Sequence, residues 1–174
     1  RKRRCWQDAL GLFQDMRQEI EDGGLGPDGI AYTAAISACE AGGRWDWALD
    51  LLAEAQQRGL EPGTWTHNAA ISACARGGEW ARALALLSEM CRAHVEVSAS
   101  TYNAALSACE RGVQWQRASE TLMEMSSAGV EANVVTCNAA ISACEKGDQW
   151  ALSLELFRAM QGRGLGLSFL GRRR

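Results

Sequence analysis

Residues 68–74 read NAAISAC, residues 103–109 read NAALSAC, and residues 138–144 read NAAISAC again. An earlier copy, TAAISAC, occupies residues 33–39, so the four copies follow one another at intervals of 35 residues. Recurrence at a fixed period of this length is the sequence signature of a repeat protein. The interval predicts four repeats, at residues 29–63, 64–98, 99–133 and 134–168.

Each repeat contains two segments whose apolar residues have helical spacing. In the first repeat the first segment carries Tyr32, Ala35, Ile36 and Cys39. The same positions recur as His67, Ala70, Ile71 and Cys74, and as Tyr102, Ala105, Leu106 and Cys109. The second segment carries Trp45, Ala48, Leu49, Leu52 and Ala55, then Trp80, Ala83, Leu84, Leu87 and Met90. Spacings of this kind predict two amphipathic helices per repeat.

A short glycine-containing turn separates the two helical segments. It reads GGR at 42–44, GGE at 77–79, GVQ at 112–114 and GDQ at 147–149. Glycine after a helix end takes the left-handed conformation without steric cost, and a short turn makes the two helices antiparallel. A single hairpin cannot bury both of its faces, so successive hairpins are expected to stack. We therefore predict an all-α fold, a right-handed α-solenoid of stacked antiparallel helical hairpins.

The two ends of the chain depart from the regular repeats. Residues 1–28 resemble the second helix of an earlier repeat, with about four extra residues that we expect within 19–26. Residues 169–174 form a basic tail. Because the chain starts with Arg1 in the middle of a repeat, we interpret it as a fragment of a longer array.

Composition excludes several classes of function. A net charge of −3 does not by itself indicate a polyanionic partner. The chain has 7 cysteines but no CxxC pair and 2 histidines, which argues against a zinc site. Cysteines on stacked helices lie too far apart for disulfides and are expected to be free. There is no membrane span or secretory signal, and we predict no cofactor, metal or small-molecule substrate.

These features resemble the pentatricopeptide repeat family of single-stranded RNA binders. The resemblance is carried by the period of 35, the Tyr-Asn or similar pair in the first helix, and the glycine-rich turn. The run Ala83–Met90 and the G-L-x-P ending at Gly59–Pro62 also match the family pattern. Tetratricopeptide repeats share the hairpin design at a period of about 34, so a protein-interaction scaffold remains the alternative.

The resemblance implies that each repeat faces one RNA base. In the family, the fifth and last residues of a repeat select the base, and the second residue packs against it. The base-selecting pairs would be Thr33 with Gly63, Asn68 with Ser98, Asn103 with Asn133, and Asn138 with Ser168. The base-packing residues would be Ile30, Trp65, Ser100 and Val135.

The chemistry of these residues suits such a role. Asparagine is a mediocre helix former, yet it recurs inside the first helix and offers both a donor and an acceptor. It lies three residues after the packing position, so the two share a face outside the core stripe. Two other interpretations stay open. The asparagine could bond backbone between repeats, and Asp28, Ser98 and Asn133 could simply be helix N-caps.

Basic residues recur late in the first helix. Arg76, Arg111 and Lys146 match a family position that approaches phosphate, whereas Ala41 departs from it. A strip of this kind on a slightly acidic chain is what an RNA groove requires. The last turn of a helix also favours cations through its dipole, so a purely structural role remains open.

The resemblance implies a target sequence and a cellular setting. By the family's pairing rules the register is 5′-purine-C-pyrimidine-C-3′, read from the N- to the C-terminal repeat. The implied function is sequence-selective RNA binding in processing, stability or translation of mitochondrial or chloroplast transcripts. The residues contain no nucleophile–base set, phosphate loop or metal cluster, so we predict no enzyme activity.

Overall fold

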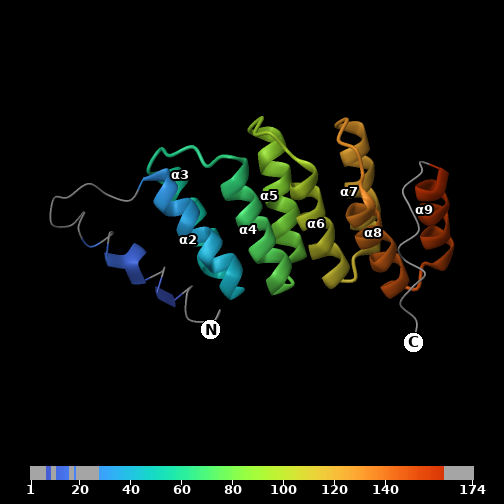
Figure 1. Cartoon of the computed structure of the whole chain (residues 1–174), viewed down its shortest axis with the longest axis horizontal. Helices are drawn as coiled ribbons and strands as arrows, with labels where there is room; N and C mark the ends of the chain where they lie inside the picture. The colour runs from blue at the N-terminus through green and yellow to red at the C-terminus, as the bar shows by residue number, and fades with distance from the viewer. Residues whose placement is uncertain (1–6, 9–10, 16–17, 19–27, 163–174) are drawn as a thin grey trace. The chain divides into compact units, whose positions relative to one another are not determined.

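The computed structural model describes residues 7–8, 11–15, 18 and 28–162, and within these ranges every regular element is a helix. The helices that complete hairpins are α2 (Gly29–Gly42), α3 (Trp45–Gln57), α4 (Thr64–Gly77), α5 (Trp80–Arg92), α6 (Ala99–Arg111), α7 (Trp115–Ser127), α8 (Val134–Lys146) and α9 (Trp150–Gly162). Each repeat thus contributes one first helix and one second helix, joined by a short turn (Figure 1). None of the helices in the described ranges has the length and apolar character needed to cross a membrane.

The chain divides into two compact units, Arg1–Val97 and Ser98–Arg174. In the first unit α2 packs against α3 and α4, α3 packs against α4, and α4 packs against α5. In the second unit α6 packs against α7 and α8, α7 packs against α8, and α8 packs against α9. First helices therefore lie beside first helices within each unit. The expectation of stacked antiparallel hairpins in an all-α fold is confirmed.

The core of each unit follows the predicted stripe of the first helices. Tyr32, Ala35, Ile36 and Cys39 are all buried, as are the equivalent residues of α4 and α6. The stripe predicted for the second helices is partly wrong. Leu51 and Leu86 are buried, whereas Leu49 and Leu84 are only half-buried. The buried set in α3 is Ala48, Leu51, Leu52 and Ala55, because this helix packs on both its own first helix and the next one.

Two of the recurrent tryptophans, Trp45 and Trp115, pack against glycines of the next hairpin. A Cβ atom added to Gly77 would lie 2.8 Å from Cγ of Trp45 and closer still to its Cδ1. A Cβ atom on Gly147 would lie 3.0 Å from Cγ of Trp115. Both glycines close a first helix, and both are needed for space and not for a positive φ. These contacts join successive hairpins.

The turns between the helices differ from one another. Gly43 and Gly78 adopt the predicted left-handed conformation, with φ of 68° and 79°. In the last two turns the left-handed residues are Val113 and Asp148, each with φ of 56°. The prediction that glycine supplies this conformation is therefore wrong there. The left-handed residue is the fifteenth of the repeat in all four turns, and in the last two repeats valine or aspartate takes the place of glycine there.

The in-phase cysteines are buried and free, as expected. Burial raises the pKa of the thiols of Cys39, Cys74 and Cys109 to about 11. These thiols therefore remain protonated near neutral pH and act as small apolar side chains.

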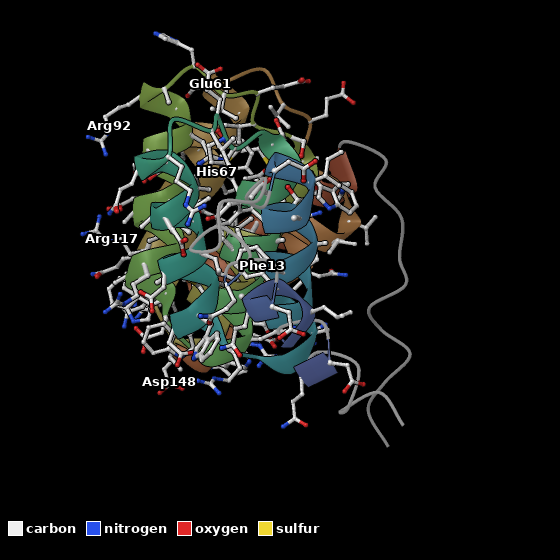
Figure 2. The ribbon with its side chains drawn as sticks, turned by 90° about the vertical axis from the view of Figure 1, so that its left-hand side faces the viewer. Phe13, Glu61, His67, Arg92, Arg117 and Asp148 are labelled. Atoms are coloured by element: carbon white, nitrogen blue, oxygen red, sulfur yellow. The ribbon has the colours of Figure 1, made fainter. Side chains whose placement is uncertain are left out.

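The predicted partial repeat at 1–28 is described only in part. Phe13, labelled in Figure 2, is buried. Its ring packs edge-on against the ring of Tyr32, with the ring centroids 4.9 Å apart. This contact attaches residues 11–15 to α2 in the first unit. The predicted insertion within 19–26, the basic tail 169–174 and Ser168 lie outside the described residues.

Candidate nucleic-acid interface

The second residue of three repeats is a large apolar side chain in solvent. Ile30 is 78% exposed, Trp65 72% and Val135 59%, and each lies in the first turn of a first helix. Ser100, which holds this position in the third repeat, is also exposed. Other large apolar side chains are exposed in the described residues, but they lie on second helices, in a turn or before α2. The recurrence at one position of the repeat marks a candidate interaction surface.

A pocket of about 620 Å³ lies between two such side chains in the first unit. Ile30 and Trp65 line it, together with Tyr32, Thr33, Gly63 and Thr66. The predicted packing and selecting residues of the first repeat are thus brought together with the packing residue of the second. The lining combines apolar walls with hydroxyl groups, which suits a planar heterocycle.

The hydroxyl groups in this pocket are linked to one another. Thr33 Oγ1 donates to the carbonyl oxygen of Gly29 at 2.7 Å and lies 2.8 Å from Thr66 Oγ1. Since Thr33 has a single hydroxyl hydrogen, Thr66 is the donor in their shared bond. Thr33 Oγ1 then keeps one lone pair that can accept a hydrogen bond from a ligand. Gly63, with no side chain, leaves the pocket open beside it.

In the second unit, too, a threonine of one repeat is hydrogen-bonded to the fifth residue of the preceding repeat. Thr136 Oγ1 lies 2.6 Å from Oδ1 of Asn103. Asn103 and Asn138 are both half-buried near the start of their helices. The threonine was missed in the sequence, although Thr66, Thr101 and Thr136 recur at intervals of 35 residues as the third residue of a repeat. All three are buried, so this regularity could have been recognised as structural.

The last residue of a repeat caps the first helix of the next. Asp28 accepts a hydrogen bond from the backbone N–H of Ala31. Ser98 and Asn133 form capping boxes with Thr101 and Thr136. The N-cap interpretation of these residues is therefore confirmed, and a cap of this kind typically contributes about 1 kcal/mol. Gly63 holds the same position before α4 without a side-chain bond.

The predicted phosphate residues lie in the last turns of first helices. Arg76, Arg111 and Lys146 are all exposed. Lys146 Nζ donates to Oε1 of Glu110 at 2.9 Å, and the hydroxyl of Ser142 donates to the same oxygen at 2.7 Å. The lysine charge is therefore partly compensated within the protein, which the sequence pattern did not indicate. In the described residues no group of His, Cys, Asp and Glu side chains is arranged to hold a metal ion.

Fold and surface together define a helical-hairpin repeat protein that presents an apolar and a polar side chain from the first helix of its repeats. The family model of the pentatricopeptide repeat domain matches residues 15–77 and 85–147. A second model, of the PPR repeat, matches residues 65–95 and 135–165. The chain belongs to the pentatricopeptide repeat family. Among curated proteins no sequence matches it.

Solved structures of this family share the fold. The crystal structure of PPR10 in complex with an 18-nt psaJ RNA element has a TM-score of 0.71 at 20% identity, covering 93% of this chain and 25% of that chain. PPR10 from maize gives a TM-score of 0.68 at 28% identity, covering 93% and 22%. The PPR domain of Arabidopsis thaliana protein-only RNase P 1, in complex with tRNA, gives 0.79 at 13% identity, covering 94% and 84%. The chain spans about a quarter of the length of PPR10.

Proposed function

We propose that these repeats bind single-stranded RNA selectively, with one base facing each repeat. The observation that carries the proposal is the exposed apolar side chain at the second position, followed three residues later by a half-buried polar side chain. An apolar wall supports the face of a base, and stacking contacts of this kind contribute roughly 1–3 kcal/mol per base. We expect the polar side chain to meet the edge of the base. The RNA ligands of PPR10 and of the protein-only RNase P 1 domain support the choice of RNA.

The proposed base-selecting pairs are Thr33 with Gly63, Asn68 with Ser98, Asn103 with Asn133, and Asn138 with Ser168. The expected register remains 5′-purine-C-pyrimidine-C-3′. The binding free energy of four such contacts is reduced by the cost of ordering a flexible RNA strand. We therefore expect an affinity no better than about micromolar. The proposed activity of these residues is binding without catalysis. We further propose that the protein acts on mitochondrial or chloroplast transcripts, which follows from the family.

The proposal is tested by fluorescence anisotropy of labelled RNAs that contain ACUC or GCUC. The control RNA carries adenines in place of the cytosines. Tighter binding to the cytosine-containing RNAs, weakened by salt, is the expected result. The double variant Asn68→Ala/Asn138→Ala should lose the preference, because both expected cytosine positions lose their polar partner.

The matched control is Gln57→Ala/Gln116→Ala, which removes two exposed amides from second helices. It should bind both RNAs as the unmodified chain does. Equal affinity of the unmodified chain for the two RNAs would contradict base selection. A helical chain that binds neither RNA would contradict RNA binding and favour a protein-interaction scaffold.

The ion pair between Lys146 and Glu110 leads to a prediction about salt. In Glu110→Gln, Lys146 loses its carboxylate partner and becomes available to a phosphate. RNA binding should tighten a few-fold, and its salt dependence should steepen by about 0.7 in the log–log slope, as one more phosphate contact requires. The measurement is the RNA affinity over a series of salt concentrations.

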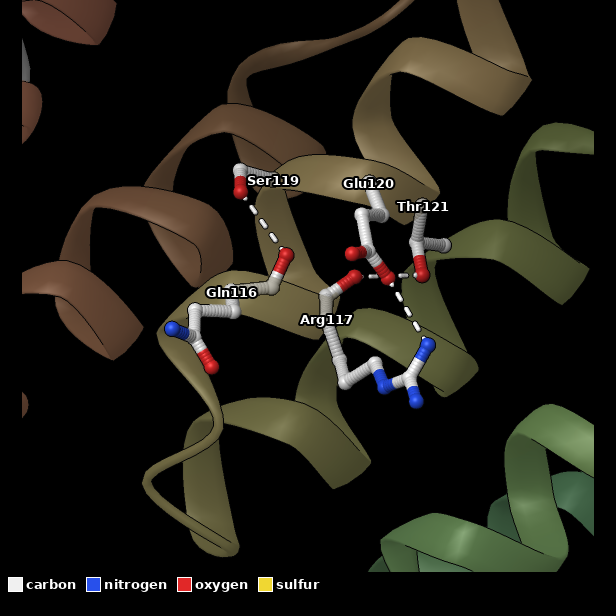
Figure 3. A network of polar contacts seen from close by, with 5 residues as sticks. All are labelled: Gln116, Arg117, Ser119, Glu120 and Thr121. Carbon is white, nitrogen blue, oxygen red and sulfur yellow. Dashed lines mark hydrogen bonds and ion pairs between the residues drawn. The ribbon is translucent and has the colours of Figure 1, made fainter.

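Glu120→Gln is the charge-matched control for this variant. Glu120 pairs with Arg117 at 2.9 Å on α7, a second helix (Figure 3). Removing this carboxylate changes the net charge equally but frees no cation on a first helix. Equal steepening in both variants would show that overall charge, and not Lys146, is responsible.

A further inference from the structure

Three buried threonines occupy the third position of successive repeats. Thr66 is 5% exposed, and Thr101 and Thr136 are fully buried. A buried hydroxyl requires hydrogen-bond partners, and each of these threonines has them near the start of its helix. Thr136 is the one whose partners include both proposed selecting residues of a single repeat. The hydrogen bonds of Thr136 therefore affect which polar groups of that repeat are available to an RNA base.

The hydroxyl of Thr136 bridges Asn103 and Asn133. Its Oγ1 lies 2.6 Å from Oδ1 of Asn103 and 2.9 Å from Oδ1 of Asn133. The same oxygen accepts from the backbone N–H of Asn133 at 3.2 Å. The backbone N–H of Thr136 in turn donates to Oδ1 of Asn133 at 3.0 Å. One side chain thus contacts the fifth and the last residue of the third repeat.

The single hydroxyl hydrogen of Thr136 and two distances decide which asparagine oxygen the hydroxyl donates to. A threonine hydroxyl has one hydrogen to donate. Oδ1 of Asn103 lies nearer to the hydroxyl than Oδ1 of Asn133 does, at 2.6 Å against 2.9 Å, so the hydrogen is assigned to the bond with Asn103. The distance of 2.6 Å agrees, because O–H···O bonds are shorter than N–H···O bonds. The carbonyl of the Asn103 amide is therefore held by Thr136, and its amino group remains to donate elsewhere.

We propose that Thr136 is a positioning residue that fixes which end of the Asn103 amide meets the RNA base. This inference rests on the proposed RNA binding. With the carbonyl held by Thr136, Asn103 presents N–H donors and favours a base with an acceptor at the atom that these donors meet. Uracil and cytosine carry the acceptor O2, whereas adenine has a C–H at the equivalent atom of its Watson–Crick edge, and its ring-nitrogen acceptors lie at other positions. The third repeat consequently prefers a pyrimidine to adenine.

The short distance also disfavours the reversed amide. If Asn103 turned its amino group toward Thr136, an N–H of that group would become the donor, and 2.6 Å is short for an N–H···O bond. Without the hydroxyl this preference disappears, and the Asn103 amide can face the base with either end. A valine at position 136 keeps the shape of threonine but removes the bridge. The third repeat should then bind uracil and adenine with similar affinity.

The test compares Thr136→Val with Thr136→Ser, using RNAs that contain ACUC or ACAC. We expect the uracil-to-adenine preference to fall roughly five-fold in Thr136→Val and to survive in Thr136→Ser, which keeps the hydroxyl. Discrimination at the fourth base, read by Asn138, should not change. Thr121→Val is the matched control, since Thr121 is a buried threonine on α7 that donates to the carbonyl of Arg117 at 2.8 Å (Figure 3). It should leave the preference intact.

A second readout needs no RNA. The side-chain amide of Asn103 should be ordered in the heteronuclear NOE of the unmodified chain and of Thr136→Ser, and mobile in Thr136→Val. An ordered Asn103 amide in a folded Thr136→Val would overturn the inference. So would an unchanged uracil-to-adenine ratio, or equal weakening of both RNAs. Absence of RNA binding by the unmodified chain would instead refute the proposed function, while the amide NOE still decides whether the bridge exists.

Discussion

Replacing Trp65 with alanine is expected to weaken binding of an ACUC-containing RNA by roughly 5- to 150-fold, the range for loss of one stacked base. Trp65 is 72% exposed and lines the pocket that also contains Ile30 and Thr33. The indole is the largest of the proposed base-packing side chains, so its removal should weaken RNA binding more than removal of the Ile30 or Val135 side chain. The measurement is fluorescence anisotropy with the unmodified chain and the variant side by side.

The fold should not be affected by this change. Substitution of an exposed side chain away from the core usually alters the free energy of unfolding by no more than about 0.5 kcal/mol. The control is Trp150→Ala, which removes a tryptophan that is 54% exposed but begins α9, a second helix. It should bind RNA as the unmodified chain does. Equal losses for the two tryptophans would show that the effect is not specific to the proposed interface.

Gly77→Ala should destabilise the first unit by about 1–3 kcal/mol, the usual cost of overpacking a close contact. The added methyl group meets the ring of Trp45 at less than 3 Å, so the indole or the helix must shift to accommodate it. In a chain of this size the melting temperature should fall by about 2–4 °C for each kcal/mol. Circular dichroism during heating measures it.

Gly29→Ala is the control for the Gly77 variant. A Cβ atom on Gly29 meets nothing within 4 Å, and alanine in a helix is favoured over glycine. Its melting temperature should stay the same or rise. A double-mutant cycle with Trp45→Ala sharpens the test, because removing the ring removes the clash. If Gly77→Ala costs as much without Trp45 as with it, the contact is not the cause.

The sequence was sufficient for the hairpins because their determinants are local. The 35-residue period and the i, i+3, i+4, i+7 spacing depend only on residues within one helix. The second helices were harder to describe. Leu51 is buried where Leu49 was expected, because a second helix packs on two neighbours and its buried face is turned toward both.

For the surface, too, local features could be predicted from the sequence and contacts between helices could not. Exposure of Ile30, Trp65 and Val135 could be predicted, because a residue outside the core stripe of its own helix has no neighbour to cover it. The pairing of Lys146 with Glu110 could not, because the two residues are 36 apart and meet only when α6 and α8 pack. The bridge from Thr136 to Asn103 likewise depends on how one first helix lies on the next.

The bonds of Thr136 have a consequence for exchanging specificity between such proteins. Asn133 caps the helix that follows it, and Thr136 belongs to the next repeat by sequence but contacts the proposed selecting residues of the preceding one. A graft bounded at residues 99–133 would separate Asn103 from its threonine. A cassette from 103 to 136 would carry the complete hydrogen-bonded set. The transplantable module of this protein is therefore offset from its sequence repeat, and chimaeras should be joined inside the first helix.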